Sequence, residues 1–307
     1  MNAGPPTIGF VGYGEVGRIL AEELRAQGRA VFAYDLKLDD PSVSQPLRTH
    51  ALAHGVALAS GHAALAAAAD LVVSAVTASQ TLVVARACAP GVRPGSFFLD
   101  FNSASPAAKQ QAAEVVDAAG GRYVEAAVMT SVPPHRLRVP LLLGGRHAAA
   151  LEPVLTDLGF SGTVASAQLG RASATKMCRS VMIKGLEAMV IECLTAARHY
   201  GVEDEVLASL AETFPGISWE SQAAYFFQRV IEHGRRRSEE VREVAHTVRD
   251  AGLAPLSAAG TAERQAWMAD LADAGVFGPR GTTEFARSRD WRTEADRILA
   301  HLSRNKD

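Results

Sequence analysis

The segment IGFVGYGEVGRILAEELRAQG, residues 8–28, decides how the first half of the chain folds. Its glycines form a G-x-G-x-x-G pattern at Gly12, Gly14 and Gly17. The apolar run Thr7–Val11 precedes them and is typical of a buried strand. Apolar side chains then recur at helical spacing up to a stop at Gly28. The order of strand, glycine turn and helix predicts a dinucleotide-binding unit rather than an ordinary loop.

Each glycine has a separate role in such a turn. We expect Gly12 to permit the tight turn, Gly14 to let the backbone approach the pyrophosphate, and Gly17 to let the helix pack closely. The helix N-terminus then faces the phosphates with its free N–H groups. The other residues of the predicted cofactor-binding turn are Tyr13, Glu15 and Val16.

An acidic residue after the second predicted strand bears on the choice of cofactor. Residues 30–34 are apolar, and Asp35 follows them about 20 residues beyond the glycines, where a carboxylate can bind the ribose hydroxyls. A carboxylate repels a 2′-phosphate, so NAD is expected rather than NADP. Lys37 could partly offset that repulsion, although an exposed lysine is its simpler interpretation.

Strands and helices continue to alternate up to about residue 165, which predicts an α/β fold with a doubly wound, mostly parallel sheet. The further expected strands are Val56–Ala59, Leu71–Val76, Phe97–Asp100, Tyr123–Val128, Leu141–Leu143 and Thr163–Ala165. Val76 and Thr77, at the end of one strand, are predicted cofactor contacts.

Beyond about residue 168 the pattern becomes helical. A long helix begins the region, and further helices are expected near Asp204–Thr213, Trp219–Glu232, Ser238–Ala251, Ala258–Ala274 and Trp291–Ser303. We therefore predict a Rossmann-type NAD(P)-binding domain over 1–167 and an all-helical domain for substrate binding and dimerisation over 168–307.

Composition excludes several classes of function. The 307 residues are 48% hydrophobic with a net charge of −2, so a nucleic-acid or membrane partner is not favoured. The three cysteines form no C-x-x-C pair, which argues against a zinc site or a disulfide scaffold, and no metal is expected. Without a visible signal peptide or a bilayer-length apolar run, a soluble, cytoplasmic protein is expected.

Four stretches together resemble the β-hydroxyacid dehydrogenase family, which includes 3-hydroxyisobutyrate and 6-phosphogluconate dehydrogenases. GFVGYGEVG is the first, and DFNSASP, residues 100–106, is similar to the family's substrate-binding segment. Residues 123–145 are similar to a third family segment that ends in a double glycine, and LGRASATKMCRS, residues 169–180, to the catalytic helix. The helical tail resembles a subgroup whose C-terminal domain has no clear functional assignment.

The resemblance implies a hydride-transferring oxidoreductase with roles for particular residues. Lys176 falls on the catalytic lysine, which exchanges a proton with the substrate hydroxyl. Asn102 and Ser103 fall on the substrate-binding pair at the mouth of a strand, while Ser105 is better placed to cap the next helix. The implied substrate is a small hydroxy acid or its carbonyl partner.

The chain also departs from the family pattern. Ser180 replaces an asparagine one helical turn after Lys176, and the neighbouring Arg179 could bind an anionic group. Lys184, another turn on, either extends this polar stripe or faces solvent. Met129 and Thr130 replace a glycine-rich turn, so we expect a reshaped pocket and an uncommon, anionic substrate.

The helical tail leaves alternatives open. His233 and Arg235–Arg237 form either a solvated helix end or an anion site reached across a dimer. The apolar face along Leu186–Leu194 predicts a homodimer that buries it. Two other functions remain: an imine reductase, whose members usually replace the lysine with aspartate or tyrosine, and a non-catalytic NAD-binding regulator.

Overall fold

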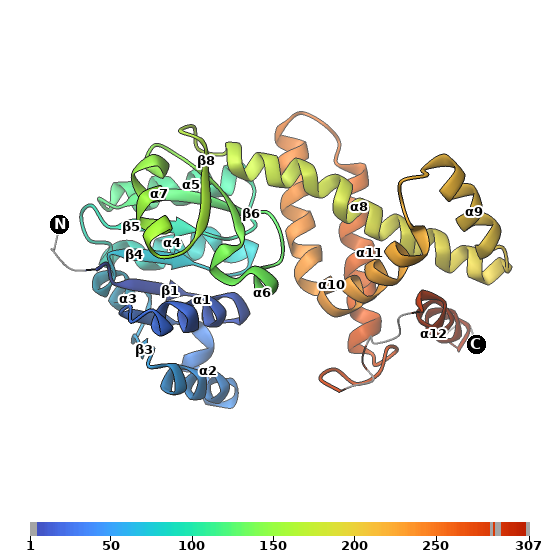
Figure 1. The fold of residues 1–307 in the computed structure, drawn as a ribbon, viewed down its shortest axis with the longest axis horizontal. Coiled ribbons are helices and arrows are strands. Elements are labelled where there is room, and N and C mark those ends of the chain that lie inside the picture. The colour runs from blue at the N-terminus through green and yellow to red at the C-terminus, as the bar shows by residue number, and fades with distance from the viewer. Residues whose placement is uncertain (1–4, 283–284, 286–289, 305–307) are drawn as a thin grey trace. The chain divides into compact units, whose positions relative to one another are not determined.

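The computed structural model describes residues 5–282, 285 and 290–304. Contacts divide the chain into two compact units, Met1–Met177 and Cys178–Asp307. The blue-to-green part of Figure 1 holds all the labelled strands, and the yellow-to-red part is helical. An α/β unit followed by a helical unit confirms the predicted fold class.

The first unit is built on one sheet of eight strands, in the order β3-β2-β1-β4-β5-β6-β7-β8. All neighbouring strands are parallel except β6 and β7, which are antiparallel. The strands are β1 Ile8–Val11, β2 Val31–Tyr34, β3 Ala57–Leu58, β4 Leu71–Ser74, β5 Phe97–Asp100, β6 Arg122–Val128, β7 Pro140–Gly144 and β8 Ser161–Ser166.

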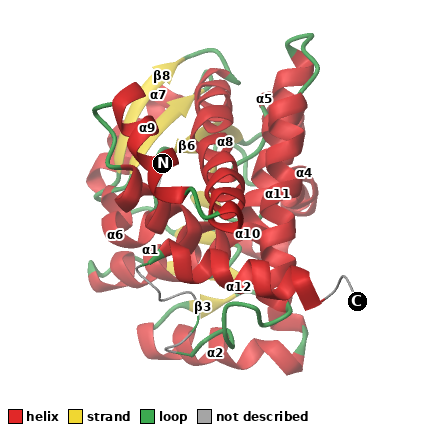
Figure 2. Ribbon diagram, turned by 90° about the vertical axis from the view of Figure 1, so that its right-hand side faces the viewer, coloured by secondary structure: helices red, strands yellow, loops and turns green. Residues whose placement is uncertain are grey.

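Helices pack on this sheet, and Figure 2 distinguishes the strands in yellow from the helices in red. Contacts link α3, α4 and α5 in one group and α1, α2 and α6 in another. Because helices pack on the sheet, β1, β4 and β5 are buried along their whole length. The helices are α1 Glu15–Ala26, α2 Pro41–His54, α3 His62–Ala68, α4 Thr81–Cys88, α5 Pro106–Ala118, α6 Val132–His135 and α7 Ala148–Asp157.

The strand order reverses between β1 and β4, which lie side by side at the centre of the sheet. The chain leaves β1 toward β2 on one side and leaves β4 toward β5 on the other. Ligands of doubly wound sheets bind at such a switch point, outside the carboxyl ends of the strands. The glycine turn follows β1, and Val76 and Thr77 follow β4, so the topology places both at this point.

Every regular element that the structure describes in the second unit is a helix. Its elements are the remainder of α8 Arg171–Tyr200, then α9 Glu203–Thr213, α10 Trp219–Asp250, α11 Leu256–Asp273 and α12 Trp291–Arg304. A core around Phe227, Trp291 and Ile298 holds them together. No helix among the described residues is both long enough and apolar enough to cross a membrane.

One prediction in this region is wrong, because α10 is a single helix where two were expected. The helix continues through Gly234, which the sequence pattern places between the two expected segments. A Cβ on Gly234 would lie 2.7 Å from the backbone oxygen of Gln265 on α11. The glycine therefore allows two helices to approach closely and does not end one.

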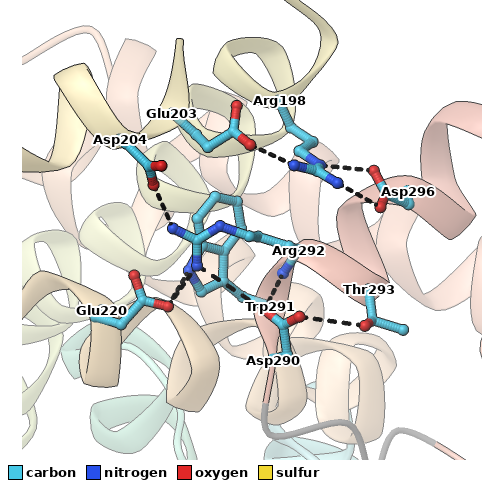
Figure 3. Close-up of polar contacts among 9 residues, drawn as sticks. All are labelled: Arg198, Glu203, Asp204, Glu220, Asp290, Trp291, Arg292, Thr293 and Asp296. Atoms are coloured by element: carbon cyan, nitrogen blue, oxygen red, sulfur yellow. Dashed lines mark hydrogen bonds and ion pairs between the residues drawn. The ribbon is translucent and has the colours of Figure 1, made fainter. Parts of the chain in front are cut away.

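Charged contacts attach α12 to the rest of the second unit (Figure 3). Arg292 contacts Asp204 at 2.7 Å and Glu220 at 2.6 Å. The Trp291 indole nitrogen donates to the same Glu220 carboxylate at 3.0 Å. Because the Trp291 ring is buried and its N–H is paired, the start of α12 has one defined position.

Candidate active site

Two glycines of the turn after β1 are required by the chain's own packing. Gly12 has a φ of +88°, and a Cβ there would lie 2.4 Å from the backbone oxygen of Ala75. A Cβ on Gly17 would lie 2.1 Å from the backbone oxygen of Gly12. Any larger residue at either position would displace the turn or the first helical turn of α1.

Gly14 differs, because none of the described residues requires a glycine there. Its φ is −76°, which any residue adopts, and no atom of the described residues lies within 4 Å of where its Cβ would be. Gly14 precedes α1, so the free N–H groups of the helix N-terminus begin beside it. Packing within the described residues does not explain why this position is a glycine. A nucleotide pyrophosphate that approaches the backbone would explain it. In the same turn, Glu15 is exposed and Val16 is half-buried.

Asp35 connects the end of β2 to the glycine turn. One carboxylate oxygen accepts from the Tyr13 backbone N–H at 2.9 Å, and the other accepts from the Lys37 N–H at 3.0 Å. Asp35 is half-buried and Lys37 is exposed. The carboxylate is thus fixed beside the turn, where a ribose hydroxyl would approach it in a protein of this fold.

The Tyr13 side chain lies inside the protein and not on the surface of the turn. The ring is fully buried, and its hydroxyl is 2.8 Å from Nδ1 of His50 on α2. Burial raises the pKa of Tyr13 to about 12, so the hydroxyl stays protonated at neutral pH. The sequence pattern indicated the position but could not show where the side chain lies.

Asn102 joins the ends of β4 and β5. Its side-chain oxygen accepts from the Val76 N–H at 2.8 Å, and its amide nitrogen donates to Ser74 Oγ at 3.0 Å. Asn102 is 3% exposed, and its amide oxygen and amide nitrogen both have hydrogen-bond partners within the protein. Asn102 therefore positions the segment that carries Val76, which is half-buried, and Thr77, which is exposed.

Lys176 and Ser103 form the central contact of the candidate site. Lys176 Nζ donates to Ser103 Oγ at 2.6 Å, although the two residues are 73 positions apart. Ser103 lies just beyond β5, and Lys176 lies in the second turn of α8. Both are half-buried, so the pair combines an ionisable amine with a hydroxyl where a substrate could reach them. Ser105 caps α5 as predicted, because its Oγ accepts from the Ala108 N–H at 3.4 Å.

The residue that holds the start of α8 is Glu125, which was not among the predicted site residues. The Glu125 carboxylate, fully buried on β6, accepts N–H groups of Gly170, Ala172 and Ser173 at 2.7, 3.2 and 3.3 Å. A negative charge at a helix N-terminus is favourable, and these bonds satisfy N–H groups that the helix leaves free. A Cβ on Gly144 would lie 2.3 Å from this carboxylate. In the sequence, a glutamate inside an otherwise apolar strand was the signal that could have indicated this buried role.

A second buried cluster, also missed, fixes the end of β5. Lys109 Nζ donates to the Asp100 backbone oxygen at 2.8 Å and pairs with its carboxylate at 2.9 Å. The Tyr123 hydroxyl donates to the other carboxylate oxygen at 2.5 Å. Burial and the Asp100 charge raise the pKa of Tyr123 well above its ordinary value. The cluster supports the loop on which Ser103 sits.

Four other predicted site residues have less direct support. Met129 follows β6 and donates its N–H to the Pro140 oxygen at 3.0 Å, and the next residue, Thr130, is exposed. Arg179 is exposed and Ser180 is 7% exposed, on the part of α8 that belongs to the second unit. Their proposed contacts with a substrate stay predictions.

The tail residues proposed as an anion site are paired with carboxylates. Arg235 contacts Asp270 at 2.6 Å and Asp273 at 2.8 Å. Arg236 pairs with Glu240 at 2.7 Å, and the buried Arg237 pairs with Glu187. They lie in the middle of α10 and not at a helix end. Arg235 thus connects α10 to α11, Arg237 connects α10 to α8, and the Arg236 pair lies within α10. The anion site across a dimer stays a prediction.

Two expectations for α8 are also corrected. Lys184 neither faces solvent nor offers its amine to a ligand, because it is 6% exposed and pairs with Glu240 at 2.5 Å. Much of the apolar face at 186–194 packs in the unit's own core, through Val190, Ile191 and Leu194. Met189 is 59% exposed and lies outside this core.

Comparison with known proteins agrees with these features. Residues 7–170 match the family described as the NAD binding domain of 6-phosphogluconate dehydrogenase, and residues 197–268 match a domain of unknown function, DUF1932. A conserved hypothetical protein from Sinorhizobium meliloti 1021 is 36% identical with a TM-score of 0.72, over 96% of this chain and 97% of that one.

Two more distant relatives carry the name of an enzyme, 3-hydroxyisobutyrate dehydrogenase. Mitochondrial 3-hydroxyisobutyrate dehydrogenase of Drosophila melanogaster is 25% identical over 72% of this chain and 67% of its own length. The Mycobacterium tuberculosis enzyme of that name shares the fold, at 17% identity and a TM-score of 0.68, over 95% of this chain and 99% of that one.

Sheet order, glycine turn and matched residues define a protein with an NAD(P)-binding Rossmann domain. The chain belongs to the β-hydroxyacid dehydrogenase family. Membership supports NAD(P)-dependent hydroxyacid dehydrogenase activity.

Proposed function

We propose that this protein transfers a hydride between nicotinamide and the hydroxyl-bearing carbon of a small hydroxy acid, with Lys176 as general acid and base. The contact between Lys176 Nζ and Ser103 Oγ carries the proposal. A solvated surface lysine would not need a buried carboxylate to hold its helix, as Glu125 does here. Nor would it meet a hydroxyl beyond β5, the strand next to the switch point.

The chain's own residues would handle the proton. A nicotinamide cofactor whose pyrophosphate lies at the glycine turn would supply a hydride acceptor at C4 of its nicotinamide ring. During oxidation, neutral Lys176 Nζ accepts the proton of the substrate hydroxyl while the carbon–hydrogen electron pair leaves with the hydride, and a carbonyl forms. In reduction the protonated Lys176 returns that proton to the oxygen. Ser103 orients the amine and can hydrogen-bond the same substrate oxygen.

We propose NAD rather than NADP as the preferred cofactor. The Asp35 carboxylate is fixed by two backbone N–H groups beside the turn, so it cannot easily move from a 2′-phosphate. Calorimetric titration should give the lower dissociation constant for NADH. A clear preference for NADPH would contradict the proposal and would indicate Lys37 as a phosphate partner.

The substrate is proposed to be small and anionic. Arg179 supplies an exposed cation one helical turn from Lys176 along α8, and Ser180 supplies a hydroxyl. Met129 and Thr130 are proposed to shape the pocket in place of a glycine-rich turn. These residues suit a carboxylate-bearing ligand, because guanidinium groups bind carboxylates in a bidentate manner.

We also propose a homodimer. Met182, Ile183 and Met189 on α8 are exposed and apolar, which a second copy would cover. Light scattering at micromolar concentration should give the mass of a dimer. A monomer mass would remove the proposed interface.

The test of function is a screen of small hydroxy acids with NAD⁺ and NADP⁺. The readout is the absorbance of the NADH or NADPH that forms. We expect turnover of at least one hydroxy acid, with a preference for NAD⁺. Cyclic imines and aldehydes with NADH form the second half of the screen. Turnover of imines alone would favour the imine reductase alternative. Tight NADH binding without turnover of any compound would favour the regulator.

A further inference from the structure

Three side chains of types that can ligate a metal gather between α1 and α2, and none of them belongs to the Lys176–Ser103 pair. Glu22 comes from α1, and His50 and His54 come from successive turns of α2. One ligand atom from each lies within 4.8 Å of the other two. Histidines four residues apart share one face of a helix, which is a common way to present two imidazoles to one ion.

The cluster is accessible and already partly ordered. All three side chains are half-buried, so an ion can reach them from solvent. The two imidazole rings lie with centroids 4.4 Å apart and planes inclined by 32°. A Glu22 oxygen pairs with Arg136 at 3.2 Å, which leaves the second carboxylate oxygen for an ion.

We propose that Glu22, His50 and His54 bind one divalent transition-metal ion of the Zn²⁺ class. Two imidazoles and one carboxylate suit Zn²⁺ or Co²⁺ better than Mg²⁺ or Ca²⁺, which prefer oxygen ligands alone. Tetrahedral Zn²⁺ with bonds of about 2.1 Å needs ligand atoms roughly 3.4 Å apart. Side-chain rotations of half-buried residues supply that contraction, and water completes the coordination.

Tyr13 gives this site an outer hydrogen bond and links it to the glycine turn. Its hydroxyl lies 2.8 Å from Nδ1 of His50, so the other ring nitrogen of His50 remains for the ion. Histidine ligands are commonly oriented by such a bond at the second nitrogen. The Tyr13 backbone N–H donates to Asp35, so one residue contacts both the metal site and the predicted ribose site.

The absence of a C-x-x-C pair argues against a cysteine zinc site, but it does not bear on this one. The positions are separated in sequence, and α1 and α2 bring them together. The site lies wholly in the first unit and uses no residue of the proposed hydride-transfer site except Tyr13.

The experiment uses the full-length protein without a histidine tag and with Co²⁺ as the probe. Visible absorption bands of bound Co²⁺ should saturate at one ion per chain, and Zn²⁺ should abolish them by displacement. His54→Ala should abolish the bands. Tyr13→Phe should weaken affinity by roughly 10–100-fold, the usual cost of removing an orienting bond. His199→Ala removes an exposed histidine of α8 and should leave binding unchanged.

Two results would overturn the proposal. One is a wild-type protein that binds Co²⁺ no better than His54→Ala, and the other is an equal loss in His199→Ala. Wild-type affinity in Tyr13→Phe would overturn the link to the glycine turn. Because these titrations contain no nucleotide and no hydroxy acid, their failure is distinguishable from a failure of the proposed hydride transfer.

Discussion

Two lysines two turns apart on α8 have different surroundings. Lys176 is half-buried, and its amine meets the hydroxyl of Ser103. Lys184 is buried, and its amine meets the Glu240 carboxylate. Burial lowers the pKa of Lys184, and the charge of Glu240 opposes that shift. The helix thus carries one half-buried amine that meets a hydroxyl and one buried amine that is held in an ion pair.

The carboxylates of the two units also differ in the groups that they bind. In the first, buried carboxylates such as Glu125 and Asp100 bind groups that support the lysine and serine of the site. In the second, carboxylates bind the arginines that once suggested an anion site. A polar residue identified from sequence is therefore a good site candidate only when its partner within the chain leaves it accessible.

The largest expected effect is the loss of turnover in Lys176→Ala. Removing a general acid and base typically costs roughly 10²–10⁴-fold, while NADH affinity and thermal stability should hardly change. Alanine is a good helix former, so α8 should persist. Ser180→Ala is the milder comparison. It should raise the activation free energy by roughly 0.5–1.5 kcal/mol, because it removes one proposed neutral hydrogen bond to the substrate. Wild-type turnover in Lys176→Ala would make the two lysines equivalent.

Lys184→Ala should show the opposite behaviour. Removing one partner of a buried ion pair costs roughly 3–5 kcal/mol, and the pairing of Arg236 with Glu240 places this case near the lower end. Urea unfolding measures the change, and NADH affinity serves as the control. A loss below about 1 kcal/mol, as for a surface pair, would show that the contact contributes little.

Two glycine variants separate cofactor binding from folding. Gly14→Ala should weaken NADH binding by about tenfold, or ~1.4 kcal/mol, because only a ligand approaches that position. Gly17→Ala should instead lower stability, because a Cβ there would lie 2.1 Å from the Gly12 oxygen. Calorimetry measures NADH binding and thermal unfolding measures stability in both variants. Lower stability in Gly14→Ala with unchanged stability in Gly17→Ala would contradict the assignment.

The smallest effect is expected for Arg235→Ala. Its ion pairs with Asp270 and Asp273 are exposed, and such pairs are typically worth about 0–1 kcal/mol. The Michaelis constant for the hydroxy acid should not change. A large rise in that constant, with stability intact, would support the anion-site hypothesis.

The parts of the fold that the sequence predicted depend on local patterns. The strand, glycine turn, helix and Asp35 lie within 30 residues, and each carries its own signal, so the predicted unit is found as expected. Bringing Lys176 and Ser103 together needed a family resemblance, because their spacing of 73 residues contains no local signal.

Other features depended on partners that a sequence pattern cannot supply. The role of Glu125 depends on the start of α8, and that of Gly234 on the approach of α11. The pairing of Arg237 with Glu187 joins α10 to α8. Such contacts are set by tertiary packing, which overrides local preference at these positions.

The most direct test of the central claim is rescue of Lys176→Ala by small primary amines. An amine that diffuses into the space left by the side chain should accept the substrate proton in place of Nζ. We predict that turnover of the best hydroxy acid from the screen rises with amine concentration in Lys176→Ala, whereas the wild type and Lys184→Ala do not respond. Full turnover of Lys176→Ala without any amine would contradict the assignment of Lys176 as the proton carrier.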